Sequence, residues 1–161
     1  KYFLSFILMI VISNSCISQI SGYVQIKAGV LDPVSVINTR NLNFGENIFP
    51  GLKMSVDKSS ENAASFIIGG EAGKQISLTL TLPSYLNNGS SELPLIFNPD
   101  DGEIVSGDTR ITFNPNATAY SIFPSSGILS INIGASVNPR DSQEPGIYSG
   151  HITIHIQYTG N

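Results

Sequence analysis

Residues 75–82 read QISLTLTL, and every second side chain in this stretch is apolar. Successive side chains of a β-strand point to opposite faces of its sheet. The stretch therefore predicts a strand that turns Ile76, Leu78, Leu80 and Leu82 toward a core and its Gln, Ser and Thr side chains toward solvent. Such alternation is typical of an antiparallel sheet with one face on the core.

The same alternation recurs twice, and turn signals separate further short apolar runs. The strong candidates are residues 128–137, with Leu129, Ile131, Ile133, Ala135 and Val137 inward, and residues 151–158, with Ile152, Ile154, Ile156 and Tyr158 inward. The weaker candidates are residues 20–30, 41–45, 52–56, 64–68, 93–97 and 109–113. About nine short strands, divided by turns such as Asn87-Asn88-Gly89 and Pro145-Gly146, predict an all-β protein. We expect an immunoglobulin-like or pilin-like antiparallel β-sandwich.

The composition fits one domain with a sizeable core. The chain has 161 residues, of which 41% are apolar and only 12% are charged. A single core of this size is common. The formal net charge of −4 and the eight scattered Lys and Arg residues argue against a nucleic-acid partner, which needs clustered basic side chains.

The first residues have the pattern of an export signal. Lys1 precedes an apolar run from Tyr2 to Ile12, and mostly small residues follow up to Ser18. This run is shorter than the roughly 20 residues that span a bilayer, and no other segment is apolar enough to do so. We predict a signal peptide at 1–18 and a single sandwich domain at 19–161. The protein is then extracellular or on the cell surface, with the periplasm or outer membrane as alternatives. Because the chain begins with Lys1 and not Met, we expect its natural start to lie upstream.

Cys16 is the only cysteine, and it allows two interpretations. It is removed with the signal peptide, or it becomes the lipidated first residue of a lipoprotein. Lipoprotein signals usually place Leu three residues before the Cys, where this chain has Ser13. Simple cleavage after Ser18 is therefore favoured over a lipid anchor at Cys16. Either way the mature domain has no disulfide.

Three motifs, in order, resemble a known bacterial family. They are Asn41-Leu42-Asn43-Phe44-Gly45, then Ala64-Ser65-Phe66-Ile67-Ile68-Gly69, and finally Pro145-Gly146-Ile147-Tyr148-Ser149-Gly150 leading to Tyr158. Together they resemble family 4402 of domains of unknown function, which is similar to spore coat protein U and to fimbrial subunits. The resemblance implies a surface or fimbria-like protein and supplies no catalytic residue. Tyr148 is expected to anchor a corner through its hydroxyl.

No pattern of catalytic or metal-binding residues stands out. Gly69 to Gln75 lacks the spacing of a phosphate loop and is better explained as a hairpin turn into the next strand. His151 and His155 lie about 13 Å apart along a strand, too far to share one metal ion. Asp100, Asp101 and Glu103 lack the full ligand pattern of a calcium loop. With no nucleophile elbow either, we predict a non-enzyme with no catalytic, cofactor-binding or metal residues and no cofactor.

The remaining functions are structural or binding roles, and the sequence leaves them open. Ile20 to Val30 alternates directly after the expected cleavage site and could add a strand to a neighbouring subunit, or it could be an ordinary first strand of its own sheet. A fimbria-like structural or adhesive subunit is the leading hypothesis. The alternative is a monomeric module that binds glycan or protein through loops 85–92 and 114–126, which carry Tyr85, Tyr120 and Phe123. A third possibility is a space-filling matrix protein.

Overall fold

The structure, a computed structural model, describes Gln25 and residues 27–160. Within these residues it contains strands and no helix, so the predicted all-β class is confirmed. Every pairing between strands is antiparallel. The strands are β1 (Ser35–Arg40), β2 (Met54–Val56), β3 (Ala64–Gly69), β4 (Gln75–Thr81), β5 (Tyr85–Asn87), β6 (Glu92–Ile96), β7 (Gly102–Ser106), β8 (Thr109–Phe113), β9 (Ala119–Ile122), β10 (Ile128–Ile133), β11 (Ala135–Val137) and β12 (Thr153–Tyr158).

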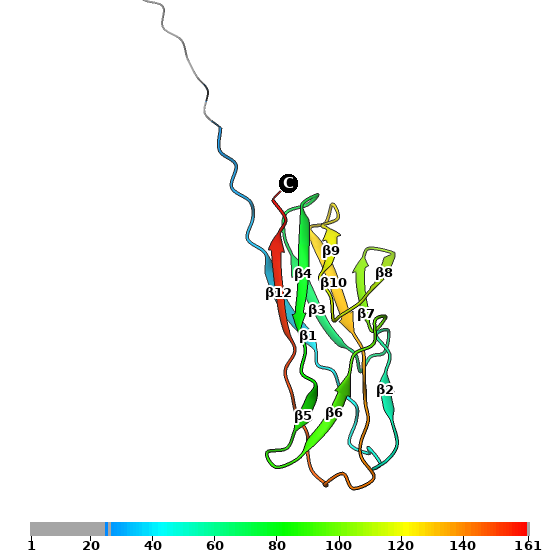
Figure 1. The fold of residues 1–161 in the computed structure, drawn as a ribbon. Coiled ribbons are helices and arrows are strands. Elements are labelled where there is room, and N and C mark those ends of the chain that lie inside the picture. Colours follow the sequence, from blue (N-terminus) through cyan, green and yellow to red (C-terminus); the bar gives the residue numbers. More distant parts are fainter. Residues whose placement is uncertain (1–24, 26, 161) are drawn as a thin grey trace, which may run out of the picture. The chain divides into compact units, whose positions relative to one another are not determined.

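The strands form a β-sandwich. A five-stranded sheet in the order β1-β3-β10-β7-β8 packs against a three-stranded sheet in the order β12-β4-β9 (Figure 1). A four-stranded sheet, in the order β2-β11-β6-β5, extends the sandwich at its other end. Apolar side chains from facing strands fill the space between the layers, as in other sandwich cores.

The core consists of two clusters of buried apolar residues. The first lies between the five-stranded and three-stranded sheets and includes Ile68, Leu78, Ile131 and Ile133. The second lies at the four-stranded end and includes Phe44, Val56, Ala63, Leu93, Leu95, Ala135 and Val137. The inward faces predicted for residues 75–82 and 128–137 are confirmed, with Ile76, Leu78, Leu129, Ile131 and Ile133 all buried.

The stretch predicted as one strand, 128–137, is two strands divided at Gly134. β10 pairs with β3 and β7, whereas β11 pairs with β2 and β6, so the chain passes here from one sheet to the next. A side chain at Gly134 would collide with the backbone, since a Cβ would lie against the Val56 carbonyl oxygen and 2.7 Å from the Lys58 nitrogen. Glycine permits this close approach.

Several expected elements differ from those observed. Residues 41–45 form no strand, although Phe44 is buried, Leu42 packs beside it and Gly45 turns with a φ of +82°. β1, β5, β7 and β9 were not predicted. The predicted strand 20–30 lies mostly outside the described residues, and its described members, Gln25 and 27–30, belong to no strand.

The proposed signal peptide and Cys16 also lie outside the described residues. In the part of the chain that the structure describes, no helix has the length and apolarity to cross a membrane.

Candidate functional site

Two strand edges on the same side of the sandwich are open. Within the described residues, β1 pairs only with β3 and β12 pairs only with β4, so each ends its sheet. The two edges nevertheless share one hollow of about 540 Å³. It is lined by the apolar Val34, Val36, Ile154 and Ile156 and by the polar Ser77, Thr79, His155 and Gln157. The sandwich is thus unclosed along this side.

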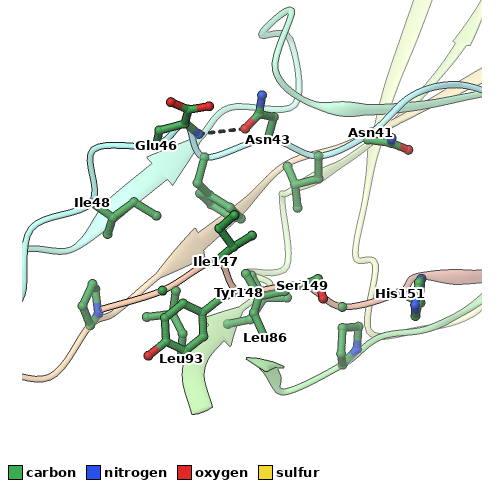
Figure 2. Close-up of a pocket in the computed structure, with 18 of the residues that line it drawn as sticks. Asn41, Asn43, Glu46, Ile48, Leu86, Leu93, Ile147, Tyr148, Ser149 and His151 are labelled. Carbon is green, nitrogen blue, oxygen red and sulfur yellow. Dashed lines mark hydrogen bonds between the residues drawn. The ribbon is translucent and has the colours of Figure 1, made fainter. Parts of the chain in front are cut away.

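A second, larger hollow lies toward the four-stranded end. Here a cavity of about 1080 Å³ lies between the chain that follows β1 and the chain that precedes β12. Figure 2 shows the segment with Asn41, Asn43 and Ile48 on one side of this cavity, the segment with Ile147 to His151 on the other, and the apolar Leu86 and Leu93 close by. We call the two hollows together the edge cleft, which runs between residues 34–48 and residues 147–157.

The free backbone groups of β12 point into the edge cleft. The Thr159 N–H donates to the Gln75 carbonyl oxygen at 3.0 Å, which fixes which residues of β12 bond to β4. Because backbone groups of a strand alternate in direction, Thr153, His155 and Gln157 bond to β4. The N–H and C=O groups of Ile154 and Ile156 then point away from β4, toward the cleft.

The free backbone groups of β1 point into the cleft as well. The Gly70 N–H donates to the Gly127 carbonyl oxygen at 2.9 Å, on the side of β3 that faces β10. Because backbone groups alternate along a strand, the N–H and C=O of Gly69 point the other way, toward β1. Ser35 stands opposite Gly69, and Val36 therefore presents its N–H and C=O to the cleft. On both edges, the residues with unpaired backbone groups are those whose side chains face inward.

The edge cleft can chemically accommodate an extended polypeptide. It offers rows of backbone donors and acceptors beside apolar side chains, which is how an added β-strand is bound. β12 carries no Asp, Glu, Lys or Arg, and the only such residue in β1 is Arg40, at its end. Among the described residues, no three His, Cys, Asp or Glu side chains come together as they would around a metal ion.

A tyrosine hydroxyl fixes the chain at each end of the cleft. At the wide end, Tyr148 donates to the Glu144 carbonyl oxygen at 2.6 Å and accepts from the Gln143 amide at 2.7 Å, which confirms the predicted corner. At the narrow end, the Tyr158 hydroxyl donates to the Asp32 carbonyl oxygen and accepts from the Glu71 N–H, both at 2.8 Å. These bonds set the positions at which the chain enters and leaves the cleft walls.

The other candidate residues do not form a site. Gly69 to Gln75 is a turn, but it is not the predicted hairpin, because β3 and β4 lie in different sheets. His151 and His155 are both exposed, and the His155 Nε2 lies 3.4 Å from the Thr81 Oγ1. Asp101 caps its own turn by accepting from the Asn98 N–H at 2.7 Å.

The aromatic residues considered for sugar stacking are dispersed. Phe123 is only 1% exposed, and its ring packs edge-on against Tyr158 with centroids 6.2 Å apart. Tyr85 lies in β5 and Tyr120 in β9, in two different sheets, and both are exposed. Phe123 therefore belongs to the core.

The sequence matches a family model described as a domain of unknown function (DUF4402) over residues 34–158. No curated protein matches the chain. The matched region begins at Val34 and ends at Tyr158, and it therefore contains both walls of the edge cleft.

Proposed function

The chain belongs to the DUF4402 family, and we propose that it is an exported, non-enzymatic subunit of the bacterial cell surface, fimbria-like or adhesive, that acts through strand-edge contacts. The observation that carries this proposal is the edge cleft. An open strand edge is a template for another chain, and proteins that remain monomeric usually protect such edges with charge, Pro or a covering segment. In the described residues, β1 and β12 have almost none of this protection.

The described contacts also favour a binding role over catalysis. The pair of Thr81 and His155 resembles a nucleophile beside a base, but it is exposed at 3.4 Å, and no carboxylate among the described contacts orients the imidazole. The cleft itself is lined mainly by apolar and amide side chains. These features support recognition of a protein strand.

Export is the part of the proposal that depends on residues 1–18. Replacing Cys16 by Ser should leave processing unchanged, because we expect cleavage after Ser18 without lipidation. N-terminal sequencing of the protein from its native cell would then find Gln19 first in both forms. Accumulation of an uncleaved precursor of the Ser variant would instead establish a lipoprotein, and retention of residues 1–12 would rule out this signal.

The strand-edge role can be tested with two matched substitutions. Val36 on β1 and Ile111 on β8 lie on the two opposite edges of the same sheet, and they are 41% and 49% exposed. Val36→Lys places a charge in the edge cleft and should remove the protein from its surface assemblies, whereas Ile111→Lys should leave them intact. The measurement is the amount and size of complexes released from native cells, with thermal melting as the check on folding.

Normal assembly of a folded Val36→Lys protein would exclude recognition through the cleft. The domain would then act through its loops, as the glycan-binding or protein-binding alternative requires.

A further inference from the structure

We propose that the strand bound in the edge cleft is residues 20–30 of a second copy of this chain, and that residues 31–34 keep the segment out of its own cleft. This inference rests on the proposed function, because it names the partner of the strand edges. Three observations carry it: the length of the segment, its apolar pattern and the way in which its connection to β1 is held.

The segment is long enough to cover most of the cleft. Residues 20–30 are eleven residues, which in strand conformation extend about 36 Å. The wall formed by β1 and the chain after it is fifteen residues long, from Val34 to Ile48, the first and last half-buried apolar residues along it. One copy of the segment would therefore occupy most of the cleft.

The side chains of the segment suit a strand with one face on a core. If the segment is extended, its sequence pattern would place Ile20, Val24, Ile26 and Val30 on one face, together with the small Gly22 and Ala28. The opposite face carries Ser21, Tyr23, Gln25, Lys27 and Gly29, and Lys27 is the only charged residue of the segment. An apolar face toward Leu42 and Ile154 would complete the core, while Lys27 stays in solvent.

The connection to β1 prevents the segment from returning to its own cleft. To pair with β1 of the same chain, it would have to turn back within residues 31–34, the usual length of a hairpin loop. Asp32 is held in place there, since its carbonyl oxygen accepts from Tyr158 at 2.8 Å and its N–H donates to Glu71 at 3.3 Å. Val34 packs on the core, so a turn would break these contacts.

Tyr158 is a firm anchor for this connection. Its hydroxyl also accepts from the Glu71 N–H, and its ring packs on Phe123, which is buried. With its own segment excluded, each copy offers one cleft and one strand. Pairing between copies then produces either an open chain of subunits or a closed reciprocal dimer.

The test compares single substitutions on the two faces of the segment in the full mature chain. Ile26→Lys places a charge on the apolar face, and Gln25→Lys places the same charge on the solvent face. The unmodified protein and Gln25→Lys should assemble with increasing concentration in sedimentation experiments. Ile26→Lys should require at least about tenfold higher concentration, because its charge would have to enter an apolar site.

A second variant tests the exclusion by residues 31–34. Insertion of eight Gly and Ser residues between Val30 and Leu31 provides enough slack for the segment to reach its own cleft. This variant should be monomeric and melt at a higher temperature than the dissociated unmodified protein. The same insertion after Gly107, at the turn between β7 and β8, should leave assembly unchanged.

The outcomes separate this inference from the proposed function. A monomeric unmodified protein, or equal assembly of Ile26→Lys and Gln25→Lys, would overturn the second copy as the partner. If Val36→Lys still disrupted the surface assemblies while Ile111→Lys did not, the cleft would bind a strand of a different protein. Undiminished assembly of the variant with the insertion at Val30 would overturn the exclusion by residues 31–34.

Discussion

Truncation of Ile133 to Ala is expected to lower the free energy of unfolding by about 2–5 kcal/mol. Ile133 is 0% exposed at the end of β10, inside the first core cluster, and truncation would leave a cavity between the two layers. Thr79→Ala is the matched control, since Thr79 lies exposed on the outer face of β4 and should change stability by less than about 0.5 kcal/mol.

Chemical denaturation of the monomeric domain, followed by a spectroscopic signal of folding, measures both values. A similar loss for Ile133→Ala and Thr79→Ala would mean that the inward and outward faces of these strands are assigned wrongly.

Gly134→Ala is expected to destabilise the domain by about 2–4 kcal/mol, although it adds only one methyl group. The Cβ would press on the backbone of residues 56–58, including the Lys58 nitrogen at 2.7 Å. This backbone cannot move freely, because Val56 pairs with Ala135 and its side chain is buried.

Gly69→Ala provides the comparison for this substitution. Its Cβ would meet only the Ser35 hydroxyl oxygen, at 2.7 Å, which can rotate away. Denaturation midpoints should therefore differ clearly between the two variants. Equal midpoints would show that the passage between sheets at Gly134 tolerates a side chain.

The sequence predicted most clearly those strands whose two faces differ in polarity. Residues 75–82 and 151–158 alternate regularly, and β4 and β12 were found there. β1 escaped prediction because each of its faces mixes one apolar side chain with polar ones, Val36 toward the cleft and Ile37 on the outer surface, where it is 59% exposed. Where alternation is lost, periodicity no longer distinguishes a strand from a loop.

β7 escaped prediction for a different reason. It holds a carboxylate, Glu103, that the fold buries on the outer face of the sheet. The Arg110 guanidinium lies 2.8 Å from this carboxylate, and the Asn132 amide donates to it at 3.3 Å. These partners come from β8 and β10, so only the pairing of the strands reveals why an acidic side chain is tolerated there.

The edge cleft depends on tertiary structure in the same way. The sequence indicated that residues 20–30 could pair with another chain. It did not indicate that β1 is the opposite wall, or which N–H groups of β12 are free. The backbone N–H of Thr153, for example, points toward β4, because backbone groups alternate along β12 and the Thr159 N–H bonds to Gln75 of β4. Pro at this position would therefore remove a hydrogen bond between β12 and β4. Strand pairing and register decide which backbone groups are free, and neither can be read from local periodicity.

The passage of the chain through Gly134 from one sheet into a second links the stability of the two core clusters. Because β10 and β11 are consecutive, the core between the five-stranded and three-stranded sheets and the core at the four-stranded end share one length of extended chain. If β10 separates from its sheet, it displaces β11 in the other sheet, and the reverse also holds. The two core clusters should therefore unfold together. A domain built this way should bear tension as one mechanical unit.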